Sequence, residues 1–146
     1  MSRVETTIQI GRPVERVFEF VTTPGNWPKW HPSSLGVSGA VDHSLEVGEQ
    51  VTEDFRVAGR LGRAVWTVRE REAPKRWVID GEAENGNRAT ITYTLTPTTD
   101  GTSFHRELVY SVLDARLEWA KMHPVVEAES AEALRRLKEV LESDAG

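Results

Sequence analysis

Alternation of apolar and polar side chains opens the chain and predicts a β-strand over residues 4–10, because successive side chains of a strand point to opposite faces. The period then changes, and apolar residues at 14, 17, 18 and 21 follow the i, i+3, i+4, i+7 spacing of a short amphipathic helix. Pro13 stands where the start of a helix tolerates proline, and Pro24-Gly25 ends it. Residues 26–32, with two Trp and two Pro, predict a turn or two packed over an apolar surface.

Strand patterns dominate the next part of the chain. Short turns rich in Gly, Pro and Asn separate six further segments, which predicts an antiparallel meander. The predicted strands are 35–41, 50–57, 60–72, 76–82, 87–97 and 102–112. Beyond Pro124 the period returns to that of a long amphipathic helix, with the proline in its first turn and an apolar stripe at Val126, Ser130, Ala133, Leu134, Leu137 and Leu141.

These elements predict an α+β fold in a single domain spanning residues 1–146. An open antiparallel sheet of seven strands must cover one face, and the last helix is the only predicted element long enough to lie across it. A strongly curved sheet that grips one helix tends to leave a cavity between them. No internal repeat or linker divides the chain.

The opening of the chain also resembles a known family. Residues 8–21, IQIGRPVERVFEFV, and residues 26–32, NWPKWHP, are similar to the entry segment of the START-like helix-grip superfamily (SRPBCC), in particular its polyketide cyclase/dehydrase-like branch. The resemblance extends from Val4 to about Glu142. It implies a helix-grip fold, in which a curved seven-stranded antiparallel sheet wraps around the long C-terminal helix and two short helices follow the first strand.

What the resemblance implies for function is a cavity that binds a small hydrophobic molecule, such as a lipid or a polyketide. The family includes carriers that bind without turnover and enzymes such as cyclases and dehydratases. A third class is an interaction module of the chaperone-coactivator kind. A filled core would favour the interaction module, an apolar cavity without convergent polar groups the carrier, and two convergent polar groups with perturbed pKa values the enzyme.

The amino-acid composition limits which kinds of binding partner and cofactor are expected. The net charge of −5 and the pI near 5.4 argue against nucleic acid, which needs clustered positive charge. No stretch approaches the roughly 20 apolar residues of a membrane span, and no apolar leader is evident, so the expected location is the cytoplasm and no membrane insertion is expected. Cysteine is absent, and the four His do not stand at metal-ligand spacings, so we expect no metal and no cofactor. The oligomeric state, monomer or homodimer, stays open.

Strand parity selects two charged candidates. Glu53 shares a face with the apolar residues of strand 50–57, and Arg106 shares one with those of strand 102–112. Because an unpaired buried charge is costly, we expect a buried Glu53–Arg106 ion pair. Either the pair is structural, or the two groups extend to solvent at the sheet edge, or the two charges orient the polar end of a ligand.

Aromatic residues supply the candidate walls of the cavity. Alternating apolar rows contain Trp66, Trp77, Ile79 and Tyr93, for which pocket lining and plain core have the same pattern. His31, which follows Trp30 where the family has the cavity mouth, is a candidate proton carrier or a solvent-exposed loop histidine. Near the expected lid, Trp119 and Met122 suit an aperture or ordinary helix packing.

Two sets of candidate residues follow. Glu53, His31 and Arg106 are the weak catalytic candidates, because an acid/base group within reach of the cavity is what ring closure or dehydration needs. The candidate ligand-binding residues are Trp30, His31, Glu53, Phe55, Trp66, Trp77, Ile79, Tyr93, Arg106, Tyr110, Trp119 and Met122.

Overall fold

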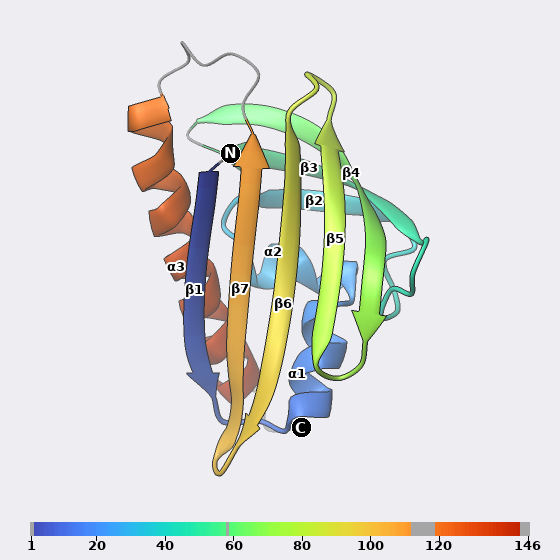
Figure 1. Cartoon of the computed structure of the whole chain (residues 1–146), viewed down its shortest axis with the longest axis vertical. Helices are drawn as coiled ribbons and strands as arrows, with labels where there is room; N and C mark the ends of the chain where they lie inside the picture. Colours follow the sequence, from blue (N-terminus) through green and yellow to red (C-terminus); the bar gives the residue numbers. More distant parts are fainter. Residues whose placement is uncertain (1, 58, 112–118, 144–146) are drawn as a thin grey trace.

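The computed structural model describes residues 2–57, 59–111 and 119–143, with the side chains of 119–121 left out. One antiparallel sheet and a long helix account for most of them (Figure 1). In chain order the elements are β1 (Ser2–Ile10), α1 (Val14–Val21), the 3₁₀ helix η1 (Pro24–Asn26), α2 (Trp27–Trp30), β2 (Ser34–Gly39), β3 (Gln50–Val57), β4 (Arg60–Glu72), β5 (Arg76–Ala83), β6 (Arg88–Thr98), β7 (Gly101–Ser111) and α3 (Trp119–Ser143).

The seven strands are ordered β1-β7-β6-β5-β4-β3-β2. Short turns connect consecutive strands from β3 to β7, and the longer segment 40–49 connects β2 to β3; together these strands form the meander that the sequence predicts. The first strand pairs with the last, from Ser2 opposite Tyr110 to Ile10 opposite Thr102. This closing pair leaves β1 and β2 at the two edges. The sheet curves so that β2, β3 and β4 lie behind β6 and β7 in Figure 1, and the concave face receives the helices.

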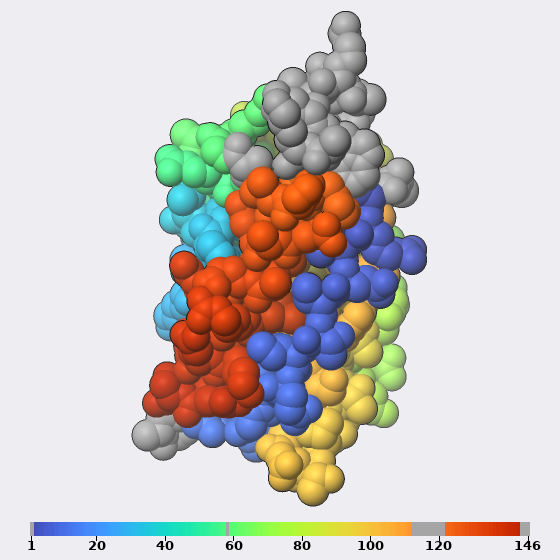
Figure 2. All heavy atoms as spheres, turned by 90° about the vertical axis from the view of Figure 1, so that its left-hand side faces the viewer, coloured from blue at the N-terminus to red at the C-terminus, as the bar shows by residue number. Residues whose placement is uncertain are grey.

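Helix α3 runs along the molecule beside β1 (Figure 2). It buries Val126, Ala133, Leu134, Leu137 and Leu141, which lie on the predicted apolar stripe. Near its C-terminal end, Lys138 Nζ donates to the Gln9 carbonyl at 2.7 Å. The helix-grip fold predicted from the sequence is therefore confirmed.

One boundary was predicted wrongly. The helix begins at Trp119, and Pro124 lies inside it instead of in its first turn. A proline among the first four residues of a helix removes no backbone hydrogen bond, because those N–H groups have no partner within the helix. Pro124 is the sixth residue of α3, so it lacks one N–H that would otherwise bond within the helix. Two strands, 50–57 and 60–72, have the predicted boundaries, and the boundaries of the others differ from prediction by one or two residues; Val112 lies outside the described residues.

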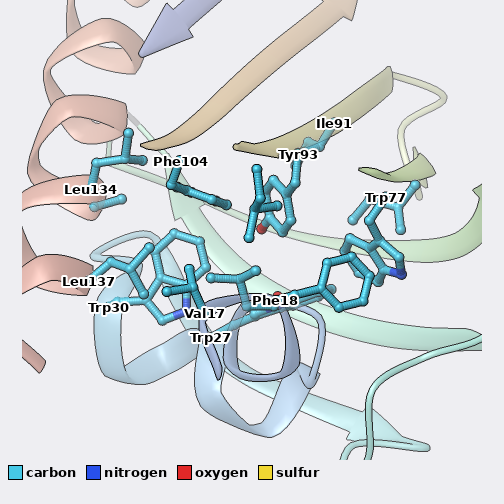
Figure 3. Packing of buried hydrophobic residues seen from close by; sticks show 14 of the residues in the cluster. Val17, Phe18, Trp27, Trp30, Trp77, Ile91, Tyr93, Phe104, Leu134 and Leu137 are labelled. Carbon is cyan, nitrogen blue, oxygen red and sulfur yellow. The ribbon is translucent and has the colours of Figure 1, made fainter. Parts of the chain in front are cut away.

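The short helices fill one end of the sheet's concave face. Helix α1 buries Val14, Val17, Phe18 and Val21 in a single stripe. Beside it, Trp30, Trp77, Tyr93 and Phe104 form a cluster of rings, with Trp77 stacked on Tyr93 at a centroid distance of 5.4 Å and Phe104 5.0 Å from Tyr93 (Figure 3). Leu134 and Leu137 of α3 close the cluster from the side. This end of the molecule is a filled core.

No helix among the described residues is long and apolar enough to cross a membrane.

Candidate ligand cavity between the sheet and α3

The other end of the concave face holds a cavity of about 220 Å³ that is partly open to solvent. Its walls come from the last residues of β3, β5 and β7, the first residues of β6, the first half of β4 and the first half of α3. Nine of the twelve predicted ligand-binding residues line it: His31, Glu53, Phe55, Trp66, Ile79, Tyr93, Arg106, Tyr110 and Met122. The structure thus brings together side chains from five strands, α3 and the residue after α2.

Two aromatic side chains lie flat on glycines of the neighbouring strand, which keeps the space above them open. A Cβ added at Gly81 would meet the Trp66 ring at 2.5 Å, and one at Gly62 would meet the Phe55 ring at the same distance. In each case the glycine is the direct cross-strand partner of the aromatic residue. Neither glycine is among the predicted site residues, although its place opposite an aromatic residue in the predicted meander is a usable signal.

Glu53 is held on the β3 wall. Its Oε1 accepts a hydrogen bond from Trp66 Nε1 at 3.0 Å. Burial raises the pKa of the Glu53 carboxyl above its ordinary value, and the side chains of Ser34 and Trp66 and the charge of Arg106 offset only part of that rise. A carboxyl group of this kind takes up and releases a proton closer to neutral pH than an exposed glutamate does.

Arg106 stands on the opposite wall, on β7. Only 6% of it is exposed, and its Nη1 donates to the Ser130 hydroxyl of α3 at 3.1 Å. Its buried Nε has no hydrogen-bond partner among the described residues. Burial lowers the pKa of the Arg106 guanidinium, and neighbouring Tyr93 and Glu53 offset part of that change. An arginine nevertheless stays charged in proteins, so the cavity contains a buried cation.

The expected ion pair between Glu53 and Arg106 is absent from the described residues, which corrects the prediction. Glu53 bonds to Trp66, and Arg106 bonds to Ser130. Four strand spacings separate β7 from β3 in the sheet, about 19 Å along a flat sheet at roughly 4.8 Å each. Curvature lets both residues line one cavity, but it does not bring them into contact.

Two further residues of the cavity, His31 and Tyr93, have shifted pKa values. His31 stacks on Trp30 with ring centroids 4.0 Å apart. Burial lowers the pKa of His31 well below its ordinary 6.5, and the charge of Arg106 lowers it further, so the imidazole is neutral at pH 7. Tyr93 is the register partner of Arg106 across β6 and β7. Burial raises the pKa of the Tyr93 hydroxyl far above its usual range.

The remaining predicted residues lie elsewhere. Trp30 and Trp77 do not line the cavity; both are fully buried in the filled core, where Trp77 Nε1 donates to the Leu45 carbonyl at 3.1 Å. The side chain of Trp119 lies outside the described residues. Ser130, predicted only as part of the apolar stripe of the last helix, lines the cavity and contacts Arg106. A polar residue inside an apolar stripe was the signal for it.

Across the described residues, no group of three or more His, Cys, Asp or Glu side chains is arranged to hold a metal ion.

Comparison with known proteins agrees with this architecture. Residues 1–142 match the family described as polyketide cyclase / dehydrase and lipid transport. The match covers nearly the whole chain, so the chain belongs to this family.

Individual relatives are more distant. The penitrem biosynthesis cluster 1 protein I of Penicillium ochrochloron is 37% identical over 65 residues, which is 43% of this chain and 42% of that protein. The crystal structure of protein CV1439 from Chromobacterium violaceum has a TM-score of 0.77 at 18% identity, over 99% of this chain and 100% of that one. The Aha1 dimer from Colwellia psychrerythraea has a TM-score of 0.71 at 20% identity, over the full length of both chains. At such identities the two structures share the fold with this chain.

Proposed function

We propose that this protein binds a small hydrophobic molecule, of the lipid or polyketide kind, in the cavity between the sheet and α3. The observation that carries the proposal is the cavity itself, bounded by the flat-lying rings of Trp66 and Phe55. Its volume of about 220 Å³ exceeds the roughly 150 Å³ of an engineered apolar cavity that binds benzene. Family membership and the relative named for a biosynthetic cluster support the same function. A filled core, expected for a pure interaction module, is found at only one end of the sheet.

The first test is native mass spectrometry of the protein as purified, compared with the same sample after organic extraction. We expect an adduct that extraction removes and whose mass identifies its chemical class. If no adduct is found, thermal shift across a panel of lipids and polyketides is the second measurement. Absence of both an adduct and any shift would contradict the proposal.

A pair of variants connects binding to the cavity. Ala64 lines the cavity and is buried, whereas Val65, the next residue on β4, is on the opposite face and exposed. Ala64→Leu fills part of the cavity, so we expect it to reduce the bound fraction or the thermal shift severalfold. Val65→Leu enlarges a side chain on the same strand and should leave both unchanged. Equal effects of the two variants would place the binding site elsewhere.

A second candidate function is proton-transfer catalysis, such as cyclisation or dehydration of the bound molecule. The observation that favours it is the raised pKa of Glu53, since a group whose pKa approaches the working pH is the more effective acid or base. Incubation with β-hydroxyketones and linear polyketide mimics, followed by mass spectrometry, would reveal loss of water. We expect Glu53→Gln to abolish turnover while binding persists. Turnover that survives this substitution would exclude Glu53 from the reaction.

A further inference from the structure

Arg106 has fewer partners than a buried guanidinium needs. The group carries five N–H donors, and the hydrogen bonds that Arg106 makes with the Ser130 hydroxyl and with the Tyr93 side chain do not use all of them. No carboxylate of the described residues pairs with it, and Nε is buried without a hydrogen-bond partner. A buried charge is normally paired, because leaving it unpaired costs more than leaving a neutral polar group unpaired. An anion would both balance the buried charge of Arg106 and accept hydrogen bonds from its unused donors.

Neighbouring groups of the cavity do not supply that anion. Glu53 bonds to Trp66 on the far wall. Tyr93, next to Arg106 on β6, has its pKa raised far above the usual range, so its hydroxyl is neutral. Two other charged residues line the cavity: Glu129, which is half-buried on α3, and Arg88, whose side chain is 72% exposed. Arg106 is thus the buried cation of the cavity, and Arg88 is a solvent-screened one.

The size and walls of the cavity limit what accompanies the anion. A volume of about 220 Å³ lies below the roughly 300–1,000 Å³ of pockets for drug-sized ligands, and suits one or two rings. Trp66 and Phe55 present flat aromatic faces to it, against which a planar ring packs well. A carboxylate offers two coplanar oxygens that match the planar fork of a guanidinium.

We propose that the molecule bound in this cavity is a small aromatic carboxylate, whose carboxylate pairs with Arg106 beside Ser130 and whose rings pack against Trp66 and Phe55. This inference rests on the proposed function and specifies its ligand class. In this proposal Arg106 selects the charge of the ligand. The rings of Trp66 and Phe55, which lie on glycines of the neighbouring strands, select its shape.

The test uses two probes of equal shape and different charge, 2-naphthoate and 2-naphthamide, with calorimetric titration at neutral pH. We expect the wild-type protein to bind the carboxylate at least about tenfold more tightly, since a hydrogen bond to a charged group contributes a factor of this order or more. Equal affinity for the two probes, or preference for the amide, would overturn the inference while leaving hydrophobic binding intact.

Variants locate the selectivity. Arg106→Gln should reduce the carboxylate preference to about twofold or less, whereas Arg60→Gln, which removes an exposed guanidinium on β4, should preserve it. The preference is the ratio of the affinities for 2-naphthoate and 2-naphthamide. If the Arg106→Gln variant still binds 2-naphthamide, the variant is folded. If that variant does not fold, Arg106→Lys keeps the charge without the fork and should give an intermediate preference. If the carboxylate preference persists in Arg106→Gln and disappears in Arg88→Gln, Arg106 is not the residue that binds the carboxylate.

The two proposals fail in different ways. If the wild-type protein binds neither probe but carries an extractable hydrophobic adduct, the aromatic carboxylate is the wrong class and the binding function stands. If it binds neither probe, carries no adduct and shows no thermal shift with the lipid and polyketide panel, both proposals are wrong.

Discussion

The two ends of the concave face are built from the same strands and differ in what covers them. At the closed end, where α1 lies in Figure 1, the rings of Trp30, Trp77 and Phe104 are fully buried; Trp30 packs against Phe104, and Trp77 packs against Trp27 and Tyr93. At the open end, where β7 finishes and α3 begins, Phe55 and Trp66 lie flat on the sheet and leave a cavity. Tyr93 stands at the boundary, stacked on Trp77 and lining the cavity.

The strands have the same alternation of apolar and polar residues at both ends, yet one end stabilises the fold and the other forms a cavity. The closed end receives the side chains of α1 and the tryptophans of α2, which fill the space over the sheet. The open end is covered by the first half of α3, which contributes Met122, Val126, Glu129 and Ser130 to the wall. Filling one end stabilises the fold, and the fold can then tolerate buried polar groups and empty space at the other.

The largest expected effect contrasts one phenylalanine from each end. Phe104→Ala removes a fully buried ring from the closed end and should destabilise the protein by about 3–5 kcal/mol. Phe55→Ala removes a partly buried ring that already borders a cavity, and we expect less than half that loss. Urea unfolding of both variants measures the difference. Similar losses would mean that the open end is as tightly packed as the closed one.

A smaller effect is expected from removing the glycine beneath Trp66. The added Cβ of Gly81→Ala would meet the indole at 2.5 Å, so the ring must move toward the cavity. We expect a loss of about 1–3 kcal/mol and weaker ligand binding, because over-packing forces neighbouring side chains from their preferred positions. Gly36→Ala on β2, where nothing lies within 4 Å of the added Cβ, is the matched control. Unchanged ligand affinity in Gly81→Ala would show that the flat ring does not define the cavity.

Glu53, at the open end, should make the stability of the protein depend on pH. Its pKa is raised in the folded state, so its contribution to stability is complete below its ordinary pKa of 4.5 and is lost as the pH rises through the folded-state value. Glu53→Gln should therefore gain stability relative to wild type as the pH rises above 4.5. Unfolding free energies across mildly acidic to neutral pH measure this. A constant difference would mean that Glu53 is ionised as in water.

The smallest expected effect comes from His31 and has the opposite sign. Burial and the charge of Arg106 lower its pKa in the folded state, so its contribution is complete above 6.5 and is lost as the pH falls through the folded-state value. The same titration on His31→Asn should show less loss of stability than wild type on acidification below 6.5. An NMR titration of the imidazole gives its pKa directly, and an unperturbed value would contradict the burial of this ring.

Much of the fold was predictable because local patterns specify it. Alternation identified every strand and the face on which Glu53 and Arg106 lie, and helical spacing identified α1 and the buried stripe of α3. The start of α3 was not predictable, because the effect of Pro124 depends on how many turns precede it, and those turns carry no strong helical period of their own.

The amino-acid sequence by itself determined which side chains face the concave side of the sheet, since strand parity is a local property. Only the tertiary structure decided which of them share a cavity. Trp66 and Trp77 have the same pattern in the sequence, yet Trp66 lines the cavity and Trp77 is packed in the core. Likewise, curvature places Glu53 and Arg106 around one space without pairing them. Sheet curvature and helix placement arise from the packing of distant segments, which no local pattern encodes.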